Sequence, residues 1–172
     1  IYDNLSGFGV SRGISLSLNH SFVFPFSYSA GFTVQDVYQQ ENSTQDTPSE
    51  RTQQLFAPLF TGTLVASYTY QPWQLSVDYT GKVVGPQHLP AFEAPFERPD
   101  ISPWYSLHNI QFNKEVGEHL DLYLAVKNVF NWTQDSPLIA PEDPFGDNFD
   151  TSYAWGPLQP RRFIIGFKIH LD

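Results

Sequence analysis

The sequence predicts an all-β fold: the antiparallel, up-and-down wall of a barrel that crosses a membrane. Residues 13–35 and 52–77 contain no Asp, Glu, Lys or Arg, and small polar residues alternate with apolar ones along both stretches. A period of two places each set on its own face of a strand. Aromatic residues make up 16% of the chain, as much as the charged residues, which is unusual for a soluble domain.

Composition excludes several other classes of protein. The formal net charge of −9 leaves no basic surface to neutralise phosphates, so nucleic acid is not an expected partner. Cys is absent, which excludes disulfides and thiolate metal sites. No wholly apolar run approaches the about 20 residues that a transmembrane helix needs, so the chain would cross a membrane as strands. A soluble sandwich would carry charge on its outer face, whereas a membrane barrel turns an uncharged polar face to a wet lumen.

Seven strands are expected from the alternation and the turn residues. They span approximately residues 8–20, 26–39, 57–70, 73–84, 103–114, 120–130 and 160–171. All 14 prolines fall in the connections or at strand starts, where no ladder N–H is lost. Seven strands cannot close a bacterial single-chain barrel, which has an even number from eight upwards. Because open edges in lipid are costly, the chain is expected to need the rest of its barrel.

The connections alternate in length and differ in charge. Short ones lie near residues 21–25, 71–72 and 115–119, and long ones near residues 40–56, 85–102 and 131–159. Short periplasmic turns and long extracellular loops are typical of outer-membrane barrels. The long connections and the leading segment hold twelve acidic residues against Arg51 and Arg98, a net charge of −10. The loops therefore account for the whole negative charge.

Alternation also predicts which side chains face lipid. The outward set in three strands comprises Leu64, Ala66, Tyr68 and Tyr70, then Trp73, Leu75, Val77 and Tyr79, and finally Phe163, Ile165, Phe167, Ile169 and Leu171. The intervening residues, such as Ser67 and Asp78, are expected to face the lumen. Strand 103–114 has no assigned facing, because Leu107 and Ile110 cannot share a face without a bulge. Tyr70, Trp73, Trp104 and Tyr105 lie near strand ends, where aromatic belts sit.

The C-terminal third resembles a known family. Residues 120–131 read Leu-Asp-Leu-Tyr-Leu-Ala-Val-Lys-Asn-Val-Phe-Asn, a long loop with Asp143-Pro-Phe-Gly follows, and Arg161-Arg-Phe-Ile-Ile-Gly-Phe opens the last strand. This pattern is similar to the last two strands of TonB-dependent outer-membrane receptors, in a form similar to that of Bacteroidetes-type bacteria. The residues that carry the resemblance are Asn128, Phe130, Asn131, Asp143, Phe145, Gly146 and Arg162.

The resemblance implies a location, an architecture and partners. Residues 1–172 would be the C-terminal part of a 22-stranded barrel in the bacterial outer membrane, supplying its last seven strands. The receptor would import a scarce nutrient (a siderophore, haem, cobalamin, metal chelate or glycan) without chemistry on it and without a cofactor. Expected partners are the remainder of the barrel and the plug domain, the TonB–ExbB–ExbD complex through that plug, outer-membrane lipid and a surface lipoprotein. The alternatives are a passive porin or small outer-membrane barrel, and a soluble β-sandwich that binds carbohydrate.

Candidate ligand contacts lie in the long loops. Phe149, Tyr153 and Trp155 are placed to contact a ligand at the barrel mouth or to pack the loop, and His88 is a candidate for haem or a metal chelate. Asp143, Asp147 and Asp150 are spaced closely enough to gather around Ca²⁺, but loop caps and solvated charge are the favoured explanation. No Ser–His–Asp constellation or paired His motif is present, so neither catalytic nor metal-binding residues are expected.

Overall fold

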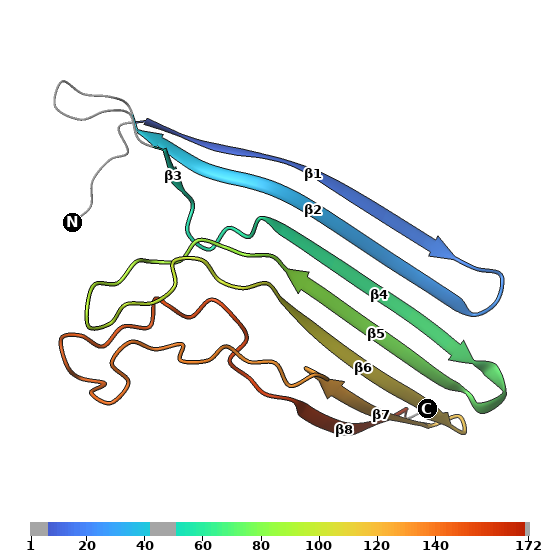
Figure 1. The fold of residues 1–172 in the computed structure, drawn as a ribbon. Coiled ribbons are helices and arrows are strands. Elements are labelled where there is room, and N and C mark those ends of the chain that lie inside the picture. Colours follow the sequence, from blue (N-terminus) through green and yellow to red (C-terminus); the bar gives the residue numbers. More distant parts are fainter. Residues whose placement is uncertain (1–6, 42–50, 171–172) are drawn as a thin grey trace.

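The computed structural model describes residues 7–41 and 51–170, which form a single antiparallel sheet (Figure 1). Its strands are β1 (Gly7–Ser21), β2 (Phe26–Glu41), β3 (Arg51–Gln53), β4 (Phe60–Tyr70), β5 (Leu75–Val84), β6 (Tyr105–Val116), β7 (Leu120–Lys127) and β8 (Arg162–Ile169). Their order is β1-β2-β4-β5-β6-β7-β8, with β3 paired to β2. The predicted all-β, up-and-down arrangement is confirmed, and a two-layer sandwich is excluded.

Helix is almost absent from the described residues. A single 3-10 turn, η1 (Gln71–Trp73), joins β4 to β5. The described part of the chain has no helix that is long and apolar enough to span a membrane.

The seven long strands match the predicted ones to within three residues at each end. The strand predicted to reach residue 130 ends at Lys127, because Asn128 has a φ of 52° and leaves the β region. The short strand β3 was not predicted. Its three polar residues carry no alternation, and they pair with only Tyr38, Gln39 and Gln40. Of the described prolines, none lies in a strand.

The strand register separates an apolar face from a polar face. Tyr68 stands opposite Val77 on one face, and Ser67 stands opposite Asp78 on the other. In β8, Phe163, Ile165, Phe167 and Ile169 stand opposite Val126, Leu124, Leu122 and Leu120. The facing predicted for the residues of these strands is therefore confirmed. Trp73 was predicted to face outwards from a strand but lies in the 3-10 turn between β4 and β5, and Leu171 lies outside the described residues.

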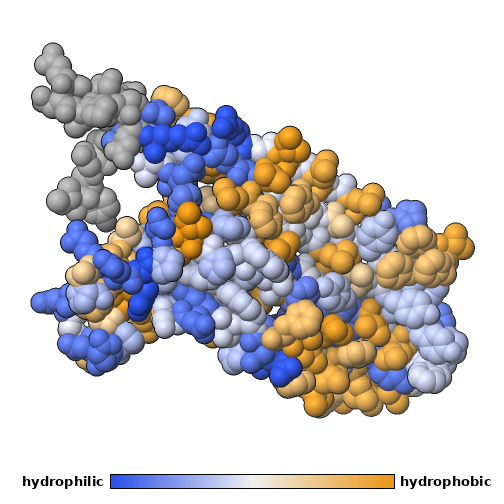
Figure 2. Space-filling model, viewed as in Figure 1, coloured by the Kyte–Doolittle hydropathy of each residue, from blue (hydrophilic) through white to orange (hydrophobic). Residues whose placement is uncertain are grey.

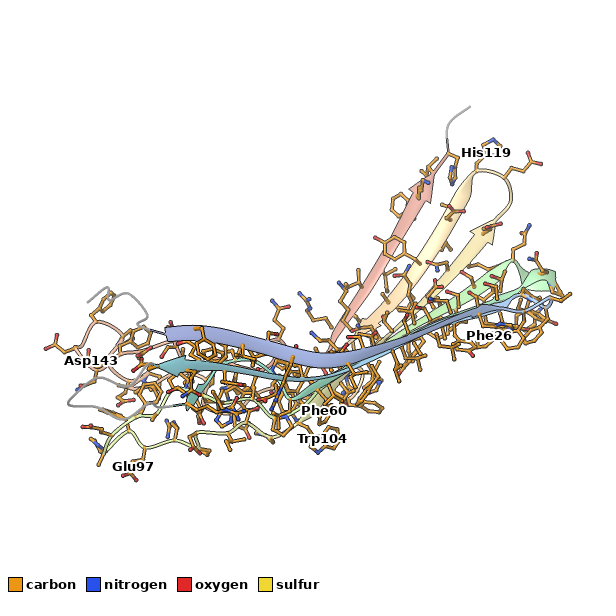
Figure 3. The ribbon with its side chains drawn as sticks, turned by 90° about the horizontal axis from the view of Figure 1, so that it is seen from above. Phe26, Phe60, Glu97, Trp104, His119 and Asp143 are labelled. Atoms are coloured by element: carbon orange, nitrogen blue, oxygen red, sulfur yellow. The ribbon has the colours of Figure 1, made fainter. Side chains whose placement is uncertain are left out.

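The apolar face is convex and exposed. The sheet curves so that β6–β8 rise away from the plane of β1 and β2, and the labelled Phe26 and Phe60 point away from them (Figure 3). Ile165 is 81% exposed, and Leu64 and Phe167 are exposed as well. Hydrophobic residues gather along the strands, whereas hydrophilic ones predominate towards the long connections (Figure 2). Such a continuous apolar surface is far larger than soluble monomers expose.

The register settles the facing of β6. Its pairing with β5 runs unbroken from Tyr105 opposite Val84 to Lys114 opposite Leu75, so no bulge is needed. Ile110 lies on the apolar face, and Leu107 lies on the polar face near the long connections. Tyr105 also lies on the polar face and stacks on Trp132 at 4.9 Å. The expectation that Tyr105 belongs to an aromatic belt was wrong, whereas Trp104 is 61% exposed as a belt residue would be.

Candidate functional site

Two long connections pack against each other beyond the ends of β5 to β8 (Figure 1). Residues 85–104 and 128–161 make up this region, which we call the loop assembly. It contains the hydrophobic cluster of buried residues Leu89, Ile139, Ala140 and Tyr153, with Phe92, Phe96 and Trp155 packed against it. Ile139 is only 1% exposed. The loops therefore fold into a defined structure with an apolar core of their own.

Gln134 holds two parts of the loop assembly together. Its side chain is buried, and its Oε1 accepts hydrogen bonds from the backbone N–H groups of Trp155 at 2.9 Å and Gly156 at 2.8 Å. Its Nε2 donates to the carbonyl oxygen of Tyr153 at 2.9 Å. A buried amide with three hydrogen bonds fixes the backbone around it. No sequence pattern predicted this role, because a glutamine between Thr133 and Asp135 is typical of a solvated loop.

Asn128 ties the start of the loop 128–161 to its end. Its Nδ2 donates to the carbonyl oxygens of Trp132 at 2.7 Å and Gln159 at 3.0 Å, and its Oδ1 accepts from the N–H of Trp132 at 3.0 Å. Asn131 acts similarly, because its Oδ1 accepts from the N–H of Arg161 at 2.8 Å. Both asparagines have positive φ, which Asn tolerates better than most residues. These two motif residues therefore shape the loop.

A cavity of about 380 Å³ opens between the two connections. Trp132, Tyr153, Trp155 and Arg98 are among the residues that line it. The Nε of Arg98 and the Nε1 of Trp155 are both buried and have no hydrogen-bond partner within the described residues. Buried N–H groups of this kind normally find an acceptor, and both belong to residues that line the cavity.

The other predicted ligand contacts occupy different settings. Tyr153 is buried and its hydroxyl donates to the carbonyl oxygen of Pro99 at 2.9 Å, while its burial raises its pKa. His88 is half-buried, and its backbone bridges to Leu55 and Ile101. Phe149 is half-buried near the tip of the long loop. The structure thus brings Tyr153 and Trp155 together at one cavity and leaves Phe149 outside its lining.

The remaining motif residues lie at the tip of the loop and at its two ends. Asp143 and Gly146 form a tight turn, in which the N–H of Gly146 donates to the Asp143 carbonyl at 3.0 Å and an added Cβ would lie 2.3 Å from Asp143 Oδ2. Phe145 in the same turn is fully exposed. Phe130 is exposed and meets the ring of His108 edge-on, with centroids 4.7 Å apart. Arg162 opens β8 on the polar face.

The loop carboxylates do not gather. Among residues 7–41 and 51–170, no three acidic or histidine side chains lie close enough together to hold a metal ion. Asp150 instead accepts a hydrogen bond from the N–H of Ser152 at 2.6 Å. This backbone hydrogen bond lowers the pKa of Asp150 below its usual value.

The polar face of the sheet divides into two parts. In the middle of β5 and β6, Asp78 accepts hydrogen bonds from Ser67 and from Asn113 Nδ2, the latter at 2.8 Å. Closer to the loop assembly stand Lys82, Lys127 and Arg162, and within the described residues none of these three has a hydrogen-bond or ion-pair partner. Asn109 and Lys127 line two cavities of about 300 and 340 Å³; Arg162 also lines the first and Asp78 the second. This half of the polar face therefore carries unneutralised positive charge.

Comparison with known proteins places the chain in a family. The family model described as "TonB dependent receptor-like, beta-barrel" matches residues 1–129. The chain belongs to this family. TonB-dependent receptor barrels are outer-membrane proteins of Gram-negative bacteria. The expected resemblance is confirmed, and the porin and small-barrel alternative is set aside. No curated protein matches the sequence.

Solved structures of a siderophore receptor and of a ferric-catecholate import receptor share the fold. The siderophore receptor PiuA from Acinetobacter baumannii matches 95% of this chain with 18% identity and a TM-score of 0.64. The ferric-catecholate import receptor Fiu from E. coli K12, in its closed form, matches 96% of this chain with 20% identity and a TM-score of 0.70. The chain spans only 22% and 21% of those two proteins. It therefore corresponds to about one fifth of a receptor, a segment of barrel wall with its loops.

Proposed function

We propose that this chain is part of an outer-membrane receptor that imports an iron–siderophore chelate carrying net negative charge. The observation that carries the substrate class is the unneutralised row of Lys82, Lys127 and Arg162 on the polar face. Family membership and the likeness to a siderophore receptor and a ferric-catecholate receptor support the same class. The polar face lines the lumen, and the long connections lie outside the cell, as in other outer-membrane barrels.

The placement of the cations favours an anionic cargo. Lys127 and Arg162 stand directly opposite each other on β7 and β8. Like charges in that position destabilise a strand pair, so an anion between them relieves a repulsion that the wall otherwise bears. The neighbouring cavity of about 300 Å³ is lined by both side chains and by Asn109, which adds a neutral polar group.

The acidic loops place a second condition on the cargo. Glu93, Glu97, Asp143 and Asp147 lie in the loop assembly, and they oppose the approach of a compact anion. A chelate in which the metal offsets much of the ligand charge is repelled less by these acidic loops than the free ligand is. Acidic loops above a basic wall therefore favour the loaded chelate over the empty one.

Energised import requires parts of the receptor beyond this chain. We infer a plug domain within the barrel and the TonB–ExbB–ExbD complex acting on that plug, as the family implies. The chain's own contribution is the lipid-facing wall, the lumen wall and the loop assembly. It performs no chemistry on the cargo, which leaves the site as it entered.

The test uses the full-length receptor that contains this chain. The double variant Lys127→Gln/Arg162→Gln should bind a ferric catecholate at least about tenfold more weakly, because hydrogen bonds to charged groups contribute about 1.5–3 kcal/mol each. Lys168→Gln is the matched control, since Lys168 lies on the same face of β8 but opposite Asp121. Uptake of radioactive iron should fall in parallel. Unchanged binding by the double variant would contradict an anionic cargo at this wall.

A further inference from the structure

A charged cluster lies on the convex, apolar face at the end of β1 and β2 that carries the long connections. The Asp36 carboxylate forms ion pairs with two arginines. Nη2 of Arg12, on β1, lies 2.9 Å from Oδ2 of Asp36, and Nη2 of Arg51, on β3, lies 2.9 and 3.0 Å from its two carboxylate oxygens. The guanidinium of Arg51 also lies over the ring of Tyr38, 3.8 Å from its centroid. We call these four residues the arginine cluster.

The arginine cluster keeps a surplus of positive charge. Two guanidinium groups share one carboxylate, so the three ionised groups sum to +1. The side chains of Arg12 and Arg51 remain 66% and 43% exposed. Each guanidinium has five N–H donors. Arg51 Nη2 also lies 3.2 Å from the side-chain amide oxygen of Gln53, and among the described residues the other donors turned away from Asp36 can bind a further acceptor. Arginine suits phosphate in particular, because its planar fork makes paired hydrogen bonds to two oxygens.

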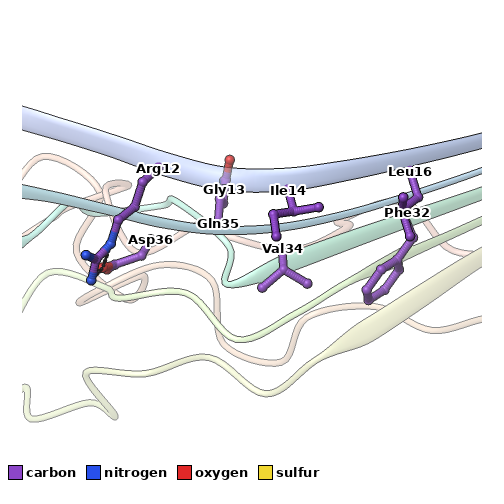
Figure 4. A pocket seen from close by; sticks show the side chains of 8 residues that line it. All are labelled: Arg12, Gly13, Ile14, Leu16, Phe32, Val34, Gln35 and Asp36. Carbon is purple, nitrogen blue, oxygen red and sulfur yellow. Dashed lines mark hydrogen bonds and ion pairs between the residues drawn. The ribbon is translucent and has the colours of Figure 1, made fainter.

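An apolar groove begins directly below the cluster. A cavity of about 650 Å³ runs along β1 and β2, with Arg12 and Asp36 at one end and Ile14, Val34, Leu16 and Phe32 along its length (Figure 4). These four apolar side chains are all exposed in the described part of the chain. A hydrocarbon chain fits such a groove, with its polar end at the arginines.

The cluster also lies at the right height for a lipid headgroup. From Phe26, at the short turn, to Asp36 is ten residues of strand, or about 34 Å at about 3.4 Å per residue. A strand tilt of about 40° reduces this to about 26 Å across the membrane, against an apolar band about 25 Å tall in outer-membrane barrels. The arginine cluster therefore lies where hydrocarbon gives way to headgroups.

We propose that the arginine cluster and the groove below it bind a phosphate-bearing lipid of the outer leaflet, with the phosphate on Arg12 and Arg51 and an acyl chain along Ile14 and Val34. The inference rests on the outer-membrane placement proposed above, but not on the identity of the imported cargo. A lipid satisfies the cationic end and the apolar groove together. A free phosphate ion would use only the arginines.

The experiment measures lipid binding to the detergent-purified, full-length receptor by native mass spectrometry. Short-chain phosphatidylglycerol is the anionic probe, phosphatidylcholine the zwitterionic probe, and inorganic phosphate the competitor without an acyl chain. A basic residue near a lipid surface contributes enough attraction for about a fivefold change in affinity. Arg12→Gln/Arg51→Gln should therefore weaken phosphatidylglycerol binding at least about fivefold, and phosphatidylcholine binding by a smaller factor, because the choline cation offsets the charge of its phosphate.

Three further arms make the outcome decisive. Lys168→Gln removes one positive charge from the opposite face and should leave phosphatidylglycerol binding as in the unmodified receptor. Val34→Ser should weaken phosphatidylglycerol binding through the groove while the arginines remain. If the double variant fails to fold, as judged by heat-dependent gel mobility, Arg12→Lys/Arg51→Lys replaces it and should weaken binding by a smaller factor. The proposal would be overturned if the arginine variants bound phosphatidylglycerol as tightly as the unmodified receptor, or if inorganic phosphate displaced the lipid completely. Iron uptake by the same variants tests the identity of the cargo separately.

Discussion

The wall of strands and the loop assembly are built for different solvents. The wall places its large apolar side chains on the surface, and within residues 7–41 and 51–170 its few buried residues, such as Val84 and Ala125, form no cluster. The loop assembly does the opposite, with Leu89, Ile139 and Tyr153 inside and acidic residues outside. Lipid removes the need for a hydrophobic core but not for hydrogen bonds. The wall therefore depends on its strand ladder, and the loops depend on burial and buried amides.

Removing part of the loop assembly should have the largest effect, because it should abolish function without disrupting the wall of strands. We predict that deleting residues 141–156 abolishes ligand-dependent growth, because the deletion removes Tyr153 and Trp155 from the loop core along with the loop tip. Barrel assembly should survive, since the strand ladder lies outside the deleted segment. Growth on iron bound to a ferric catecholate and heat-dependent gel mobility are the two measurements.

A shorter deletion sharpens that result. Removing residues 142–148 takes away the exposed Phe145 and the tight turn but leaves the core and Gln134 in place. Growth retained by the shorter deletion would locate the function in the folded part of the loop. Loss of membrane insertion with either deletion would show instead that the loop is needed to assemble the wall.

Asn128 is the residue through which the wall positions the loops. Asn128→Ala removes three side-chain hydrogen bonds to the part-buried backbone groups of Trp132 and Gln159. Each lost bond costs about 1 kcal/mol, so we expect the loop assembly to lose about 3 kcal/mol. Hydrogen exchange in residues 129–161 should rise while exchange in β4 to β6 stays slow. Asn148→Ala, at an exposed position, is the control, and equal effects of both variants would refute this role.

Two adjacent residues of β4 compare the faces of the wall. Leu64 and Val65 are similarly exposed, at 39% and 44%, but lie on the apolar and polar faces respectively. Leu64→Arg should lower the free energy of unfolding in lipid vesicles by about 2–4 kcal/mol, the usual cost of a mid-membrane arginine on a barrel. Val65→Arg should cost little, because water reaches the lumen. Denaturant unfolding of the full-length receptor measures both, and equal costs would contradict the assignment of the faces.

The wall could be predicted from the sequence, whereas the loop assembly could not. Alternation along Thr63–Tyr70 determined the faces because each strand repeats one local rule, and the register confirmed them residue by residue. The role of Asn128 depends on Gln159, 31 positions away, and that of Gln134 depends on Trp155. Local patterns do not record such contacts. The facing of Leu107 and Tyr105 could not be predicted for the same reason, because their neighbours on the polar face come from the distant loop at residues 132–158.

The charges of the polar face illustrate the same limit. Lys82, Lys127 and Arg162 lie on three different strands, and only the register brings them to one half of the lumen wall. Counted along the sequence, they are three of nine basic residues in an acidic chain. The acidic loops by themselves favour a neutral or cationic complex or a metal chelate, and the basic wall below them favours an anionic one.

The smallest expected effect is a local dependence on pH in the loop assembly. The hydrogen bond from the Ser152 N–H holds the pKa of Asp150 below the usual value of 3.8. A lowered pKa means that the stabilisation is present above pH 3.8 and is lost as the pH falls through the folded-state pKa. The ladder between Ile139 and Asp150 should therefore loosen in acid, seen as faster hydrogen exchange at these two residues. Asp150→Asn keeps an acceptor for Ser152 without a titrating proton, so its exchange should show no such transition, and an identical acid transition in both proteins would place its origin elsewhere in the loop.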